Sequence, residues 1–102
     1  MQVEKASVQP PPGIPASMVA AYVQRWIMAL PDARAALAGS DHNALRVLGH
    51  RLKGSGGGYG IPQLTAIGAC IEEASKRGDA AELRMQVSAL EVYLSRIEVL
   101  PE

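Results

Sequence analysis

Four stretches of this 102-residue chain carry apolar residues at steps of three and four, the spacing that places side chains on one face of an α-helix. Such stripes must pack against one another to leave water, so they constrain the fold more than any other feature of the sequence. The stripes consist of Met18, Tyr22, Trp26, Ile27 and Leu30; Leu45, Leu48 and Leu52; Leu64, Ile67, Ile71 and Ala74; and Leu83, Val87, Leu90, Leu94 and Ile97. The chain is therefore predicted to form four helices.

Residues with known preferences for helix ends stand between these stretches. Asp41 and Asp79 are good N-cap residues, and Glu82 completes a capping box with Asp79. Gly78 suits the left-handed position that ends a helix. Pro31 lacks the N–H that would bond to the carbonyl of Ile27, so the first helix is expected to kink or start again there.

The connections between the predicted helices are short, which leaves no length for a crossover. Consecutive helices are then expected to pack antiparallel. A chain of this length has room for one domain with one core. No alternation of the kind that builds a sheet is evident. The expected fold class is all-α, an up-down antiparallel four-helix bundle.

Residues 1–15 differ from the rest because four prolines, Pro10, Pro11, Pro12 and Pro15, remove backbone donors that a helix would need. We expect a proline-rich linker or a poorly ordered N-terminal segment there, and a folded domain over residues 16–100.

Charge and cysteine content exclude several classes of function. Ten basic residues balance ten acidic ones, so charge gives no support to a nucleic-acid or membrane-surface role. Cys70 is the single cysteine, which excludes a disulfide framework and a four-cysteine zinc site, and we expect it to be a small packed side chain. Without a secretory signal or an apolar run of about 18 residues, the chain is expected to be soluble and cytoplasmic.

The glycine-rich segment around His50 holds the residues best suited to chemistry. Leu45, Leu48 and Leu52 point inward, whereas His50 shares another face of the helix with Arg46, Lys53 and Gly54. An exposed, largely neutral imidazole keeps a lone pair on one ring nitrogen, which can attack phosphorus.

Lys53 and Arg46 lie within one turn of His50, where a cation can pair with a phosphoryl group. Gly54 has no side chain to block an approaching protein. The glycines do not form a nucleotide loop, because a P-loop requires G-x-x-x-x-G-K-[ST] after a strand. Trp26 and the tyrosines are interpreted as residues of the core or its rim.

The run His50-Arg51-Leu52-Lys53-Gly54-Ser55, with Gly60, Leu64 and the pair Ile71-Glu72 further on, resembles the H-x-L-K-G-S pattern of histidine-containing phosphotransfer (HPt) domains. The resemblance covers roughly residues 22–94. It implies that His50 is phosphorylated on its outer ring nitrogen, that Lys53 assists the phosphoryl group, and that Gly54 gives the partner access. Many members have cysteine at the position of Gly68.

The resemblance also implies supporting roles for Glu72, a position that often contacts the histidine ring, and for Lys76 one turn later. The implied function is that of a phosphorelay intermediate, a phosphocarrier in two-component signal transduction without ATP-dependent kinase activity of its own. Its partners would be response-regulator receiver domains, including the receiver of a hybrid histidine kinase. It would need no cofactor itself, since Mg²⁺ is expected on the receiver. The alternative is a helical adaptor that docks a receiver or other signalling partner without being phosphorylated.

Overall fold

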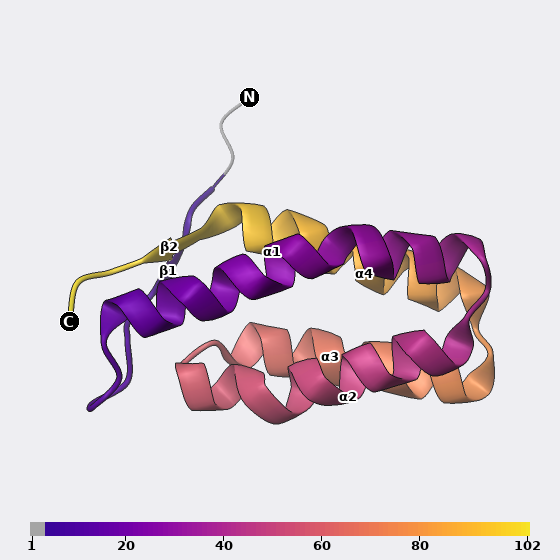
Figure 1. Cartoon of the computed structure of the whole chain (residues 1–102), viewed down its shortest axis with the longest axis horizontal. Helices are drawn as coiled ribbons and strands as arrows, with labels where there is room; N and C mark the ends of the chain where they lie inside the picture. The colour runs from indigo at the N-terminus through magenta and orange to yellow at the C-terminus, as the bar shows by residue number, and fades with distance from the viewer. Residues whose placement is uncertain (1–3) are drawn as a thin grey trace.

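Four helices make up most of the computed structural model, which describes residues 4–102 (Figure 1). The elements are β1 (Ala6–Val8), α1 (Ala16–Ala38), α2 (His42–Gly56), a 3₁₀ turn η1 (Gly57–Tyr59), α3 (Pro62–Arg77), α4 (Ala80–Arg96) and β2 (Ile97–Val99). The prediction of four helices is confirmed. Within residues 4–102, none of the helices has the length and apolar character of a membrane span.

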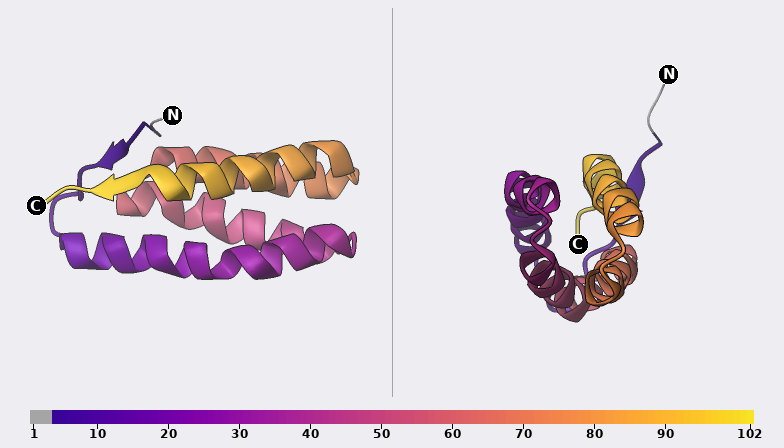
Figure 2. Two further views of the ribbon diagram at one scale, coloured as in Figure 1. Left: turned by 90° about the horizontal axis from the view of Figure 1, so that it is seen from above. Right: turned by 90° about the vertical axis from the view of Figure 1, so that its right-hand side faces the viewer.

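Each helix packs against two others, so that α1 contacts α2 and α4, and α3 contacts α2 and α4. Viewed along the bundle, α2 and α3 form the base of a U whose arms are α1 and α4 (Figure 2). The core between them contains fully buried side chains from every helix, among them Val19, Leu45, Leu64 and Leu90. The most extensive contact is between α2 and α3, the two helices that carry the candidate site.

The predicted helix ends are confirmed at three positions. The side chain of Asp41 accepts a hydrogen bond from the Ala44 N–H at 3.0 Å, and that of Asp79 accepts one from the Glu82 N–H at 3.0 Å. Gly78 ends α3 with a φ of 66°, in the left-handed region. Side-chain caps therefore fix where α2 and α4 begin, and the left-handed backbone of a glycine fixes where α3 ends.

The first helix was expected to kink or start again at Pro31, and it continues through Pro31 as one helix, so a new start does not occur. Pro31 is exposed, where water can bond to the carbonyl that loses its partner. The buried face of this helix differs from the prediction at one position. Met18 was placed on the inward stripe but is 51% exposed, whereas Val19 is fully buried. Val19, Tyr22 and Val23 are the buried residues at this end of the helix, so Val19 occupies the inward position that was predicted for Met18.

Two short strands also correct the expectation of a chain without sheet. β1 pairs with β2 in parallel, with Ala6 opposite Ile97 and Val8 opposite Val99. Val8 is 4% exposed, and its carbonyl accepts from the Leu100 N–H at 2.9 Å. The segment predicted as a linker over residues 1–15 thus contains a strand, while its first three residues lie outside the described part of the chain. A three-residue strand whose partner is 91 positions away leaves no local pattern to detect.

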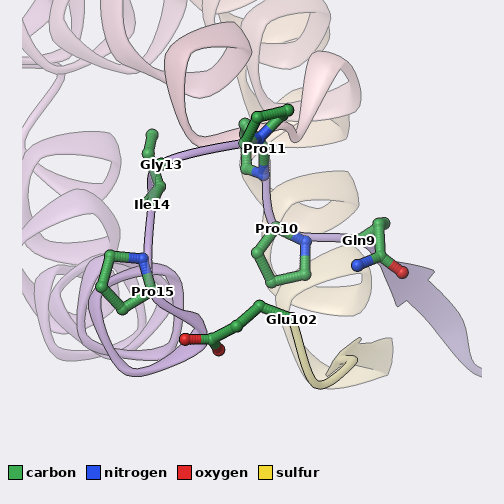
Figure 3. A pocket seen from close by; sticks show the side chains of 8 residues that line it. Gln9, Pro10, Pro11, Gly13, Ile14, Pro15 and Glu102 are labelled. Atoms are coloured by element: carbon green, nitrogen blue, oxygen red, sulfur yellow. The ribbon is translucent and has the colours of Figure 1, made fainter.

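The proline segment after β1 curves around a hollow of about 600 Å³ at the N-terminal end of α1 (Figure 3). It is lined by residues 9–15 and Glu102. A carboxylate oxygen of Glu102 accepts from the Ala16 N–H at 2.8 Å, which satisfies one of the free amides at the start of α1. This hollow takes no residue from α2 or α3 and stands apart from the histidine.

Candidate functional site

His50 lies in the second half of α2, on the face opposite the buried leucines. Its side chain is 67% exposed, whereas Leu45 and Leu52 are fully buried. The helical period accounts for this, since His50 is five residues after Leu45 and two before Leu52 and so falls outside their stripe. The imidazole is accessible to another protein.

A carboxylate from α3 contacts the imidazole ring of His50. Glu72 Oε2 lies 2.8 Å from His50 Nδ1, and Glu72 Oε1 lies 2.7 Å from Lys53 Nζ. Glu72 itself is only 5% exposed. One buried carboxylate therefore joins the histidine and the lysine that are one turn apart on α2.

Glu72 and Lys53 each stabilise the charged form of the other. The hydrogen bonds from Lys53 and from His50 hold the pKa of the Glu72 carboxyl at about 2, against an ordinary 4.5 and against the opposing effect of burial. The hydrogen bond with Glu72 in turn raises the pKa of the Lys53 ammonium above its ordinary 10.5. Glu72 is thus ionised and Lys53 is charged at neutral pH.

The ionised carboxylate determines the tautomer of the ring. A carboxylate can only accept hydrogen bonds, so the Nδ1 atom of His50 must donate. In a neutral imidazole the lone pair is then on Nε2, the nitrogen on the other side of the ring. The arrangement supplies an exposed nitrogen nucleophile next to a cation.

Glycines allow α2 and α3 to approach closely enough for this contact. A Cβ on Gly68 would collide with the Lys53 nitrogen and would lie 2.7 Å from the Gly49 carbonyl oxygen. A Cβ on Gly49 would lie 2.7 Å from the Glu72 nitrogen. Real side chains do not fit at such distances, so Gly49 and Gly68 set the helix separation that brings Glu72 beneath His50.

The remaining predicted site residues lie around this centre. A Cβ on Gly54 would meet nothing within 4 Å, so this position is open to a partner. Among the contacts of the described residues, Arg46 donates to Asn43 Oδ1 at 3.0 Å and Lys76 lies 3.8 Å from Glu73. Lys76 acts on the centre only through its charge, which helps to lower the pKa of Glu72.

A cluster of aromatic residues borders a surface groove between α1 and α2. The sequence alone did not indicate this groove. Tyr22 stacks on Tyr59 with ring centroids 4.0 Å apart and meets Trp26 edge-on at 6.4 Å. A hollow of about 580 Å³ beside them is lined by these rings, Arg25 and Arg51. A smaller hollow of about 210 Å³ shares Trp26 and Arg51, so the two continue along the groove next to the histidine helix.

Cys70 is exposed, so the prediction that it is packed was wrong. It lies on α3 two positions before Glu72, on the face of the helix turned away from α2. Within the described residues, no group of three side chains has the composition of a metal site.

In a comparison with protein-family models, the model described as Hpt domain matches residues 17–99. The matched range contains all four helices except the first residue of α1, together with the centre formed by His50, Lys53 and Glu72. Searches of curated proteins and of solved structures return no match. With four-fifths of its length matched, the chain belongs to the Hpt domain family, whose members are histidine phosphotransfer modules of two-component signalling.

Proposed function

We propose that this protein is a phosphorelay intermediate that carries a phosphoryl group on Nε2 of His50 and exchanges it with the aspartate of receiver domains. The observation that supports this most strongly is the 2.8 Å contact between Nδ1 and the ionised Glu72. It leaves the lone pair on the other nitrogen of a ring that is 67% exposed.

Transfer from a receiver begins when the Nε2 lone pair attacks the phosphorus of the aspartyl phosphate. The N–P bond forms as the P–O bond to the aspartate breaks, and the electron pair leaves on the aspartate carboxylate. The Nδ1 proton stays on the ring, and the Glu72 carboxylate offsets the positive charge that the phosphorylated ring acquires. The reverse steps return the phosphoryl group to a receiver.

Lys53 is proposed to stabilise the phosphoryl oxygens during transfer. Its ammonium has three N–H donors, of which one is directed to Glu72 Oε1 at 2.7 Å. Its side chain is 43% exposed, so the other donors are accessible. Gly54 is proposed to leave room for the receiver at the next position.

The receiver is proposed to bring the Mg²⁺ that neutralises the phosphoryl group. An aspartyl phosphate is already activated, so the proposed role of this chain includes no ATP-dependent step. The receivers concerned include that of a hybrid histidine kinase.

The groove between α1 and α2 is proposed as part of the receiver-docking surface. Its aromatic walls offer apolar contact area, and Arg25 and Arg51 place two cations at its edge. The acidic residues that hold Mg²⁺ in a receiver complement these charges.

The finer topology that we propose is the up-down antiparallel bundle. Helices that are consecutive in the chain are also in contact, and the connection between α1 and α2 is only residues 39–41. This order places α1 and α3 on either side of the histidine helix.

Replacement of His50 tests the proposal. His50→Gln is expected to abolish acid-labile, alkali-stable labelling by a phosphorylated receiver domain while leaving the helical circular dichroism spectrum unchanged. The matched control is His42→Gln, since His42 is the other histidine of the chain. Continued labelling of the His50 variant would refute the proposal, and receiver binding without any labelling of the wild type would favour the adaptor instead.

A further inference from the structure

At the end of α2, the hydroxyl of Thr65 lies between a backbone carbonyl of α2 and the first backbone N–H of η1. The Gly57 N–H donates to Thr65 Oγ1 at 2.8 Å, and Thr65 Oγ1 donates to the Lys53 carbonyl at 3.1 Å. Gly57 is four residues after Lys53, so these two groups are the pair that a continuing α-helix would join directly. A side chain from α3 has been inserted into the hydrogen-bond ladder of the histidine helix.

A glycine makes the insertion sterically feasible. A Cβ on Gly56 would lie 2.7 Å from the Thr65 nitrogen and 2.8 Å from its Oγ1. Any larger residue at Gly56 would displace the hydroxyl. The run Gly56-Gly57-Gly58 has a low intrinsic helix propensity. The Thr65 hydroxyl on α3 compensates for this with its hydrogen bonds to the Gly57 N–H and the Lys53 carbonyl.

The same face of α3 holds Lys53 in three ways. Thr65 bonds to its carbonyl, Gly68 packs against its backbone nitrogen, and Glu72 binds its ammonium at 2.7 Å. Residues 65, 68 and 72 are three and four apart, so they share one stripe of the helix. The carbonyl and the ammonium of Lys53 are thereby both held by side chains of α3.

We infer that Thr65 is a positioning residue for phosphoryl transfer, acting through Lys53. It closes the last turn of α2, which keeps the Lys53 ammonium directed to the space beside His50. The inference rests on the proposed function, because it concerns the rate of the same transfer. Thr65 itself does not touch the reacting atoms.

The test compares Thr65→Val, which keeps the shape and removes the hydroxyl, with Thr65→Ser, which keeps the hydroxyl. Thr65→Val is expected to slow labelling of His50 from a phosphorylated receiver by about tenfold, with an unchanged Kd for the receiver. Thr65→Ser is expected to retain the wild-type rate. Amide hydrogen exchange at Gly57 should be faster in Thr65→Val and unchanged in Thr65→Ser.

A double-mutant cycle with Lys53→Ala separates positioning from general stability. If Thr65 acts through Lys53, Thr65→Val has no further effect on the rate once Lys53 is alanine. Additive effects, or a wild-type rate in Thr65→Val, would overturn the inference. Thr65→Ala, which removes the hydroxyl while favouring the helix, takes the same place in the cycle if the valine variant does not fold. Failure to label the wild type would overturn the proposed function and this inference together, whereas labelling with additive effects overturns this inference alone.

Discussion

At the scale of single residues, Glu72 controls both chemical groups of the site. It is nearly buried, yet it remains ionised because Lys53 and His50 donate to its two oxygens. The cost of burying the carboxylate is met by two short charge-assisted bonds. Its effect is to fix the tautomer of His50 and the place of the Lys53 ammonium at the same time.

Glu72→Gln should slow phosphoryl transfer to His50 by at least about tenfold, because it removes the charge that offsets the phosphorylated ring. Stopped-flow or rapid-quench labelling with a phosphorylated receiver measures the rate. Glu73→Gln is the control, since Glu73 is exposed and its nearest cation is Lys76 at 3.8 Å. Equal rates for wild type and Glu72→Gln would show that the carboxylate has no part in transfer.

Glu72 should also make stability depend on acid. Its folded pKa, about 2, is below its ordinary 4.5, so the unfolded chain binds the proton more readily between these values. The contribution to the free energy of unfolding is present above pH 4.5 and is lost as the pH falls toward 2. Urea unfolding across this range should show a smaller acid loss for Glu72→Gln than for the wild type. Identical losses would contradict the ionised, doubly bonded carboxylate.

At the scale of elements, the pair α2 and α3 works as one unit because glycines bring the two backbones together. Gly49 and Gly56 on α2 face Gly68 and Thr65 on α3. The close approach lets the side chain of Glu72 on α3 reach both His50 and Lys53 on α2. Helix spacing is therefore part of the site's geometry.

Two glycine-to-alanine changes separate this role from helix propensity. Gly68→Ala should lower the free energy of unfolding by about 1–3 kcal/mol, because the new methyl meets the backbone of α2. Gly54→Ala should raise it by up to about 1 kcal/mol, since the methyl there meets open space and alanine favours the helix. Chemical denaturation gives both values. Similar changes in the two variants would mean that the helices are not in close contact at Gly68.

The elements themselves followed from local signals, as the caps at Asp41 and Asp79 and the stop at Gly78 illustrate. What could not be predicted depends on distant partners. The pairing of Ala6 with Ile97 has no local signature, and Met18 and Val19 are adjacent apolar residues that only tertiary packing distinguishes. The His50 and Lys53 pair was visible because both lie on one helix turn. Thr65 was not, because its role depends on how closely α3 approaches α2.

At the scale of the whole molecule, the bundle presents the histidine beside a groove rather than within a cavity. Trp26 borders both hollows of that groove and is half-buried. A large aromatic side chain so placed is the kind of residue that dominates binding energy at protein interfaces. The groove thus runs along the histidine helix, whose imidazole is exposed.

Trp26→Ala should weaken receiver binding by about 2 kcal/mol, roughly a thirtyfold rise in Kd. Labelling of His50 by phosphoramidate, a small donor that needs no docking, should be unaffected. Met85→Ala is the control, since Met85 is 64% exposed on α4 and outside the groove. Titration calorimetry measures Kd, and unchanged binding in Trp26→Ala would remove the groove from the interface.

The most direct test of the proposed function is to identify which ring nitrogen of His50 carries the phosphoryl group. We expect ¹⁵N NMR of the neutral His50 ring to show the proton on Nδ1, and phosphorus coupling after labelling to appear on Nε2 of His50. Phosphorus on Nδ1, on another residue, or nowhere in the protein would contradict the account.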